Sequence, residues 1–337
     1  MPLPRFALLL LGLLVPAAFA ATAPAYDLFL CANLNRNYTI GAKVQASNGV
    51  RQWDPSGTWQ HLGYNDGTIT SVAFDPRDRN VMYTSALNGL WRTFDGGQHW
   101  RICNDWSMTE ARDVALDRNA PDHVYLALPD GIAVSTDRGQ TLVRREDGLP
   151  ARGKYTQVLH IDRTRAGRVF AGCETGIYLT ENGAQRWRRV LPTTDTVYDI
   201  QQSPHDPRLW LAATHSAGLH RSTDGGNTWG KVESAPSTNP LYNVTFDVTQ
   251  PQRLALGSWT LGVFTSEDGG KTWVDRNAGL PAPHNVWRVG IGPTGRLYAS
   301  VAGHTLFVSA DFGRTWQPDT IAAAQVNKFL LVPRNAP

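Results

Sequence analysis

The sequence predicts an all-β fold, a single seven-bladed β-propeller, and three observations carry that prediction. An eight-residue motif recurs along the chain at a nearly fixed interval, which is the signature of a repeat architecture. Each interval contains four short strand patterns and no helical periodicity, which is typical of an all-β ring. The two ends of the chain supply complementary parts of one further unit, so the ring can close on itself.

The repeated motif is clearest at Ser222–Trp229, which reads STDGGNTW. Three further strong copies end in Trp100, Trp273 and Trp316, and two weaker copies end in Leu142 and Trp187. A degenerate seventh copy runs from Asp54 to Trp59. The acidic slot of the six better copies holds Asp95, Asp137, Asn182, Asp224, Asp268 and Asp311, so the interval is about 43 residues.

This motif suits a tight turn. A short carboxylate accepts hydrogen bonds from the N–H groups of its own turn, and glycine adopts a positive φ without a steric penalty. The motif resembles the Asp-box, or bacterial neuraminidase repeat, of sialidases, xyloglucanases, sortilin-type receptors and photosystem II assembly factors. The resemblance implies a hairpin turn between the third and fourth strands of each blade. We therefore expect the six residues in the acidic slot to be structural.

The strand patterns repeat in order within each unit. In the second unit they are Ile69–Phe74, Val81–Ser85, Leu90–Thr93 and His99–Cys103. In two later units they are Val197–Gln201, Leu209–Ala213, Leu219–Ser222 and Thr228–Val232, and then Val286–Ile291, Arg296–Ser300, Thr305–Ser309 and Thr315–Gln317.

The chain ends predict how the ring closes. Val326–Val332 looks like a first strand that no further strand follows. Asp27–Cys31, Gly49–Trp53 and Thr58–Leu62 supply second, third and fourth strands with no first strand before them. The C-terminal strand is therefore expected to pair into the N-terminal blade, which leaves no open sheet edge.

The N-terminus predicts export. Arg5 precedes an apolar run from Phe6 to Val15, and Ala18-Phe19-Ala20 forms a small-x-small cleavage site. The run is too short to span a membrane. We expect residues 1–20 to be a signal peptide, residues 21–337 to be the propeller, and the protein to be secreted or periplasmic with no transmembrane segment.

Composition excludes several function classes. Cys31, Cys103 and Cys173 are too few for a disulfide framework, and no Cys/His spacing indicates a metal site. A net charge of +3 without a basic stripe argues against a nucleic-acid partner. We expect no cofactor, no metal and a monomer.

Any binding site is expected on the face opposite the Asp-box turns, around the central channel, because ligands of the resembled families bind there. Aligning the first strands by a central apolar residue (Val72, Val114, Val158, Ile200, Val244, Val289 and Phe329) gives two rings of channel residues. The residue before it is polar in all seven units: Ser71, Asp113, Gln157, Asp199, Asn243, Arg288 and Lys328. The residues one step earlier are Thr70, Arg112, Thr156, Tyr198, Tyr242, Trp287 and Asn327.

Aromatic and imidazole side chains gather in three consecutive units. The predicted ligand-binding residues are Tyr198, His215, Tyr242, Trp259, His284, Trp287 and His304. Flat aromatic faces beside hydrogen-bonding groups suit the apolar and hydroxyl faces of a sugar. The alternative for the same channel mouth is a protein partner, as in the photosystem II assembly factors. A hydrated channel lining without a ligand is a third interpretation of these rings.

For catalysis, Asp113 and Asp199 are the candidate carboxylate pair, and Arg288 is suited to a substrate carboxylate. A glycoside hydrolase or a polysaccharide lyase would use these residues. The Phe/Tyr-Arg-Ile-Pro motif of sialidases is absent, which argues against a sialidase. Xyloglucanases build their cleft between two propellers, and this chain supplies one. The long loop from Ala32 to Asn48 is either functional or part of a flexible N-terminal region.

Overall fold

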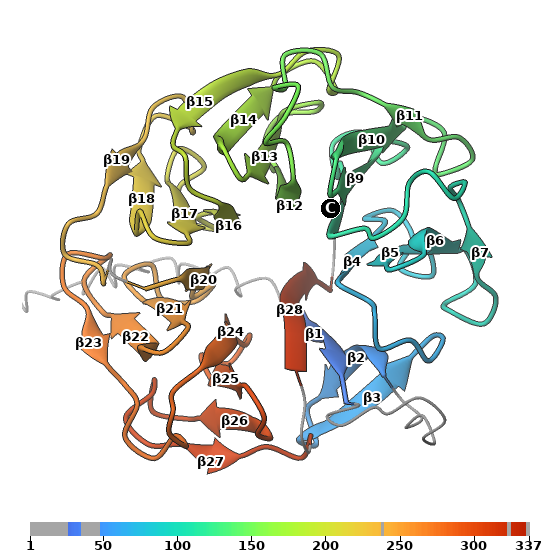
Figure 1. Ribbon diagram of the computed structural model, residues 1–337. Coiled ribbons are helices and arrows are strands. Elements are labelled where there is room, and N and C mark those ends of the chain that lie inside the picture. The colour runs from blue at the N-terminus through green and yellow to red at the C-terminus, as the bar shows by residue number, and fades with distance from the viewer. Residues whose placement is uncertain (1–25, 35–47, 237–238, 322–324, 335–337) are drawn as a thin grey trace, which may run out of the picture.

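Seven four-stranded antiparallel sheets stand around a central axis (Figure 1). They are seen in a computed structural model that describes residues 26–34, 48–236, 239–321 and 325–334. The described residues contain strands and turns but no helix. The fold is therefore the all-β, seven-bladed propeller that the repeat predicts.

The blades are numbered here from the one that contains the chain ends. Blade 1 comprises β28 (Gln325–Pro333), β1 (Tyr26–Asn33), β2 (Gly49–Asp54) and β3 (Thr58–Leu62). Blade 2 comprises β4 (Ser71–Phe74), β5 (Met82–Ala86), β6 (Gly89–Thr93) and β7 (Arg101–Ile102). Blade 3 comprises β8 (Asp113–Leu116), β9 (Val124–Leu128), β10 (Gly131–Ser135) and β11 (Val143–Arg144).

The other four blades repeat this order from the channel outward. Blade 4 comprises β12 (Thr156–Ile161), β13 (Val169–Cys173), β14 (Gly176–Thr180) and β15 (Arg188–Pro192). Blade 5 comprises β16 (Val197–Gln202), β17 (Trp210–Thr214), β18 (Leu219–Ser222) and β19 (Gly230–Lys231). Blade 6 comprises β20 (Leu241–Phe246), β21 (Leu254–Ser258), β22 (Gly262–Ser266) and β23 (Val274–Asp275). Blade 7 comprises β24 (Val286–Ile291), β25 (Leu297–Val301), β26 (Leu306–Ser309) and β27 (Gln317–Pro318).

The C-terminal strand closes the ring as predicted. β28 pairs antiparallel with β1, with Leu30 opposite Phe329 and Asp27 opposite Val332. In Figure 1 the last strand lies on the channel side of the first one. Asp27 also accepts hydrogen bonds from Arg334 at 2.7 Å and from Arg79 of blade 2 at 2.5 Å. The two ends of the chain are thus joined by backbone pairing and by charge.

The hydrophobic core lies between neighbouring blades. One cluster joins Tyr125 and Ile132 of blade 3 to Leu159 and Trp187 of blade 4. The Trp187 indole also donates a hydrogen bond of 2.9 Å to the backbone oxygen of Arg145 in blade 3. Because a large buried aromatic side chain dominates the packing energy around it, such residues hold adjacent sheets face to face.

The repeat turns are built around their acidic residue. Oδ1 of Asp224 accepts the backbone N–H groups of Asn227 and Thr228 at 3.0 Å, and its Oδ2 accepts the Thr228 hydroxyl at 2.7 Å. Ser222 donates to Oδ1 and accepts from the N–H of Gly226. Gly226 has a φ of 84°, and a Cβ there would lie 2.4 Å from the Phe170 ring. This geometry fits the structural role expected for the acidic slot.

The fourth strand of blade 1, Thr58–Leu62, is as predicted, but three other fourth strands are shorter than the sequence predicts. His99–Cys103, Thr228–Val232 and Thr315–Gln317 are the predicted ranges, whereas β7, β19 and β27 each hold two residues. The cause is the turn itself, because its carboxylate binds the N–H groups of residues such as His99 and Thr228. Those residues belong to the turn and not to the strand ladder.

One face of the ring carries both the repeat turns and the turns between first and second strands, and we call it the turn face. Within a blade, the N–H of Gly96 donates to the oxygen of Asn80, and the N–H of Gly225 donates to that of Arg208. The same bond recurs between Gly269 and Gln252. The other face, which we call the aromatic face, carries the loops between second and third strands and those between blades.

Several expectations concern residues that the structure does not describe. The predicted signal peptide, residues 1–20, lies outside the described residues, as does most of the loop between Ala32 and Asn48. Within the described ranges, no helix is long and apolar enough to cross a membrane. The three cysteines are free, with Cys31 and Cys173 buried. No group of metal-ligating side chains occurs in the part of the chain that is described.

Candidate functional site

Backbone bulges place the predicted aromatic side chains at the channel mouth. In β16, Val197 pairs with Thr214 and Asp199 with Ala213, so Tyr198 is an extra residue in the ladder. Tyr242 in β20 and Trp287 in β24 occupy the same bulge position. A bulge bends the strand locally and redirects the side chain of its extra residue. Three consecutive first strands therefore each present an aromatic residue at one place.

These three rings contact one another. Tyr198 and Tyr242 meet edge to face with centroids 4.9 Å apart, and Tyr242 stacks on Trp287 at 5.0 Å. Trp259, from the β21–β22 loop, packs against Trp287 at 4.7 Å and against Tyr242 at 5.8 Å. His215 approaches Tyr198 at 5.9 Å. We call these five residues, Tyr198, His215, Tyr242, Trp259 and Trp287, the aromatic cluster.

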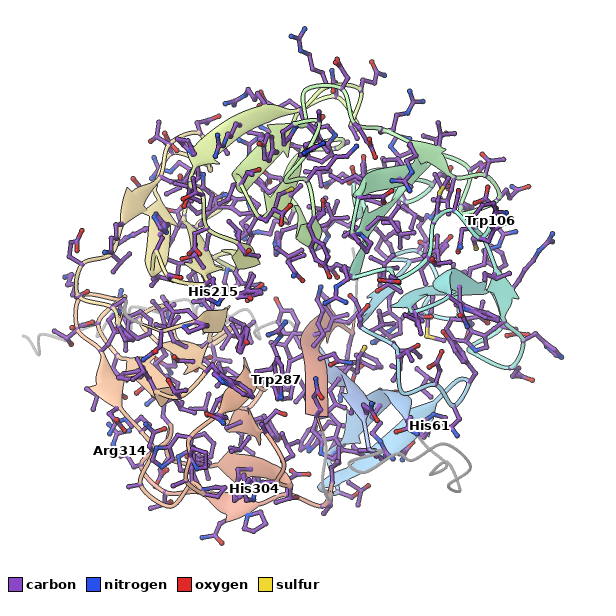
Figure 2. The ribbon with its side chains drawn as sticks, viewed as in Figure 1. His61, Trp106, His215, Trp287, His304 and Arg314 are labelled. Carbon is purple, nitrogen blue, oxygen red and sulfur yellow. The ribbon has the colours of Figure 1, made fainter. Side chains whose placement is uncertain are left out.

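The two other predicted histidines do not contribute a ring to this cluster. Within the described residues, neither His284 nor His304 makes a ring contact with any of its members. Figure 2 shows Trp287 close to the channel and His304 far out along blade 7. Their predicted contact with a ligand at the mouth remains a prediction.

Asp195, which no sequence pattern identifies, supports the edge of the cluster. Oδ2 of Asp195 accepts the N–H groups of Ser216 and Ala217 at 2.5 and 2.7 Å, and its Oδ1 lies 3.9 Å from Nδ1 of His215. Asp195 therefore holds the β17–β18 loop, and with it His215, beside Tyr198. The only signal for it in the sequence is its place in a short polar loop before β16.

The two carboxylates predicted to be catalytic bind the backbone of the next blade. Oδ2 of Asp113 accepts the N–H of Leu159 at 3.0 Å, and Oδ2 of Asp199 accepts that of Val244 at 3.1 Å. Asn243 does the same to the N–H of Val289 at 2.9 Å. Both aspartates are buried. Burial raises the pKa of Asp199, against the lowering effects of its bond from Gln201 and of the charge on Arg288.

Arg288 lies at the base of the aromatic cluster. Its Nε donates to the oxygen of Asn327 at 3.0 Å, and its Nη1 donates to the oxygens of Tyr242 and Trp287. Its guanidinium carbon is 6.0 Å from the Tyr242 ring centroid, within the range of a cation–π contact. Burial lowers its pKa, and Asp199 and Asp113 oppose that effect. With Asp113 and Asp199, it lines a cavity of about 90 Å³.

The predicted ring of seven polar channel residues is wrong in blade 4. There, Thr156 pairs with Cys173 and Val158 with Gly172, so Gln157 is the bulged residue. The unit is therefore offset by one residue from the sequence alignment, and Leu159 takes the central apolar position. Val158, an apolar residue, stands where the alignment placed Gln157. Six of the seven positions are polar in the structure.

Comparison with known proteins supports the fold and gives no family. No family model matches the chain. A curated oligoxyloglucan-reducing end-specific xyloglucanase from Emericella nidulans is 25% identical over 264 residues, which is 62% of this chain and 32% of that protein. The chain thus spans about a third of the relative's length.

Two kinds of solved structure share the fold. The GH74 enzyme of Niastella koreensis superposes with a TM-score of 0.65 at 17% identity, over 79% of this chain and 50% of that one. A structure of YCF48 bound to D1 peptide superposes with a TM-score of 0.56 at 19% identity, over 75% of this chain and 82% of that one. The chain is a β-propeller. At this identity, the likeness establishes the fold alone.

Proposed function

We propose that this protein is an exported glycan-binding propeller, secreted or periplasmic, whose site is the aromatic cluster at the channel mouth. The observation that supports this most is the continuous contact of Tyr198, Tyr242, Trp259 and Trp287, which come from three neighbouring blades. Three of these residues stand at bulges, so their backbone positions are set by the ladder and not by mobile loops. A surface of rigid rings loses little conformational entropy when a ligand stacks on it.

Hydrogen-bonding groups surround the rings. The hydroxyl groups of Tyr198 and Tyr242 and the imidazole of His215 are donors and acceptors suited to sugar hydroxyls. Burial raises the pKa of Tyr198 and of Tyr242, which keeps both phenols protonated and able to donate at neutral pH. Alternating apolar and polar contact of this kind is what a pyranose ring presents to a protein. The similarity to xyloglucanases points to the same class of ligand.

Catalysis by Asp113, Asp199 and Arg288, in a glycoside hydrolase or a polysaccharide lyase, stays a prediction. Asp113 is bound to Leu159 and Lys328, and Asp199 to Gln201 and Val244. Carboxylates used in this way brace the channel. Binding is therefore the core of the proposal, and a release assay tests cleavage separately.

The experiment is a screen of the purified protein against neutral, uronic-acid and sialylated glycans, with both binding and reducing-end release measured. Replacing Tyr242 and Trp287 together by alanine should abolish retention, because that variant removes the centre of the cluster. Trp106→Ala is the matched control, since Trp106 is 88% exposed and lies at the outer edge of the ring (Figure 2). Retention that survives the double substitution would refute the site. Release that is lost in Asp199→Asn would establish an enzyme.

A second candidate is a protein-binding scaffold, and the match to YCF48 favours it. This chain covers 82% of that structure, which was determined with a peptide bound, but only half of the GH74 enzyme. Two results together would support the scaffold over the glycan. No glycan binds, and a defined protein is retained by the native chain but not by the Tyr242→Ala and Trp287→Ala variant.

A further inference from the structure

A second and larger cavity opens at the other end of the channel, on the turn face. Its volume is about 580 Å³, against about 90 Å³ for the cavity beneath the aromatic cluster. Lys328 and Phe329 line both cavities. Lys328 also forms an ion pair of 2.6 Å with Asp113, which lines the smaller cavity. Val158 and Gln201 line both cavities as well, but most residues of the turn-face cavity line it alone, and no part of the proposed function uses it.

The walls of this cavity combine apolar and charged side chains. Residues of four first strands line it, among them Val72, Val114, Leu159, Leu330 and Val332. His160 adds a ring that packs edge to face on Trp210 at 5.2 Å. Burial is the main cause that lowers the pKa of His160 to about 4, so the imidazole is neutral at physiological pH. A ligand inside the cavity would therefore contact apolar side chains as well as charged ones.

Cationic side chains stand at the mouth and are unequally neutralised. Arg77 is paired with Asp75 and Asp122, and Asp27 pairs with both Arg79 and Arg334. In contrast, Arg118 and Arg163 have no carboxylate partner among the described residues.

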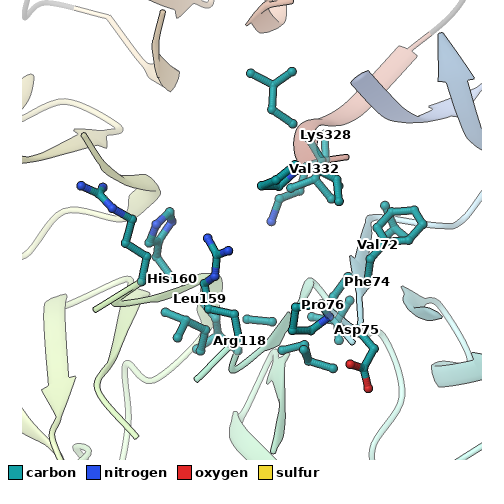
Figure 3. Close-up of a pocket in the computed structure, with 18 of the residues that line it drawn as sticks. Val72, Phe74, Asp75, Pro76, Arg118, Leu159, His160, Lys328 and Val332 are labelled. Atoms are coloured by element: carbon teal, nitrogen blue, oxygen red, sulfur yellow. The ribbon is translucent and has the colours of Figure 1, made fainter. Parts of the chain in front are cut away.

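Arg118 and Arg163 both line the turn-face cavity. Arg118 is exposed and extends into the cavity opposite Lys328 (Figure 3). Arg163 is partly buried and donates one hydrogen bond from Nη1 to the oxygen of Ser203. Burial is the main cause that lowers the pKa of Arg163; Asp162 and Asp206 oppose that effect, and repulsion from Arg118 adds to it, so the guanidinium groups of Arg118 and Arg163 lie within electrostatic range of each other. An anion between them would relieve this repulsion.

We propose that the turn-face cavity binds a small organic anion with an apolar body, typified by an aliphatic carboxylate. Its carboxylate lies between Arg118 and Arg163, and its hydrocarbon part lies against Val72, Val114, Leu330 and Val332. The cavity falls within the range of about 300–1,000 Å³ that is typical of small-molecule sites. Guanidinium groups suit carboxylates because their planar fork offers two parallel donors.

Isothermal titration calorimetry with sodium octanoate and with 1-octanol tests the proposal. Octanoate should bind, and octanol, which has the same chain without the charge, should bind at least about tenfold more weakly, because a hydrogen bond to a charged group contributes about 1.5–3 kcal/mol. Arg118→Gln should weaken octanoate binding by about tenfold, and the double variant with Arg163→Gln should abolish it.

Two controls separate the site from general effects. Arg165 belongs to the same turn as Arg163 but is 66% exposed, pairs with Glu181 and does not line the cavity, so Arg165→Gln should leave the affinity unchanged. The Tyr242→Ala and Trp287→Ala variant alters only the opposite mouth and should also bind octanoate normally. Absent octanoate binding, equal binding of octanol, or an equal loss in Arg165→Gln would overturn the proposal. Thermal unfolding of each variant checks that it remains folded.

Discussion

The carboxylate of Asp199 in blade 5 accepts the backbone N–H of Val244 in blade 6 at 3.1 Å. Asp113 makes the equivalent bond from blade 3 to Leu159 of blade 4, and Asn243 makes it from blade 6 to Val289 of blade 7. One structural position in the first strand thus ties each of three blades to its successor. Either a carboxylate or an amide can do this, because the bond requires only an acceptor oxygen.

Asp199→Asn should therefore keep the blade contact, whereas Asp199→Ala should lose it. Alanine leaves a buried N–H without a partner, which costs about 1–3 kcal/mol in the free energy of unfolding. Urea unfolding at pH 7 measures both variants. If asparagine were as destabilising as alanine, the interblade bond would not be what Asp199 contributes.

The stability difference between Asp199→Asn and the native protein should depend on pH. Burial raises the pKa of Asp199 in the folded state, so its stabilising contribution is complete below the unfolded pKa of about 3.9 and is lost as the pH rises through the folded pKa. Asparagine cannot ionise. The free energy of unfolding of Asp199→Asn, relative to that of the native protein, should therefore increase as the pH rises from 4 to 8. A difference between the two free energies that stays constant over this range would contradict the prediction.

The repeat turns predict the opposite pH dependence. The pKa of Asp224 is lowered to about 2: burial opposes the shift, but hydrogen bonds from Thr228 and Ser222 outweigh it. Its contribution is therefore present above the unfolded pKa of about 3.9 and is lost as the pH falls towards 2. Asp224→Asn should flatten the acid limb of a stability curve measured between pH 5 and 2.5. The native turn at Asn182 already lacks this charge, so Asn182→Asp should steepen that limb.

The repeat spacing, the residue pattern and the chain ends were enough to predict the fold, since each blade needs its own turn and a ring needs a closing strand. The offset in blade 4 was not predictable from that pattern. Val158 and Leu159 are adjacent apolar residues, and only the pairing with Gly172 decides which of them occupies the central position. A bulge inserts one residue into a strand, and the pattern of apolar residues does not reveal where it lies.

The candidate site was predictable only in part, for a related reason. Equal spacing from the strand centre brought Tyr198, Tyr242 and Trp287 to one mouth, because the repeat fixes where first strands begin. Asp195 belongs to a loop that varies between blades, so no repeat position identified it. The turn-face cavity depends on which of its arginines have carboxylate partners. Some of those partners come from the neighbouring blade, as Asp122 does for Arg77, and the strand pattern does not identify them.

Close packing between blades gives a steric prediction. A Cβ added at Gly172 would lie 2.6 Å from Cγ1 of Val158 and 3.0 Å from the backbone oxygen of Val197, in the next blade. Gly172→Ala should destabilise the protein by about 1–3 kcal/mol, as overpacking of a core does. Gly230→Ala is the control, because no atom lies within 4 Å of its added Cβ. Equal urea midpoints for the two variants would contradict this account of blade packing.

The ion pair between Lys328 and Asp113 gives the last prediction. Nζ of Lys328 lies 2.6 Å from Oδ1 of Asp113, whose side chain is only 3% exposed. Lys328→Met removes the charge partner and leaves a buried carboxylate unpaired. The free energy of unfolding should fall by at most about 3–5 kcal/mol, because solvent already screens the partly exposed lysine.

Adding Asp113→Asn to that variant should recover much of the loss, because the amide still accepts the N–H of Leu159 and no charge remains buried. A double-mutant cycle from urea unfolding gives the coupling energy directly. Additive losses in the cycle would mean that the two side chains act independently. A strong coupling would show that the two side chains stabilise the fold as a pair.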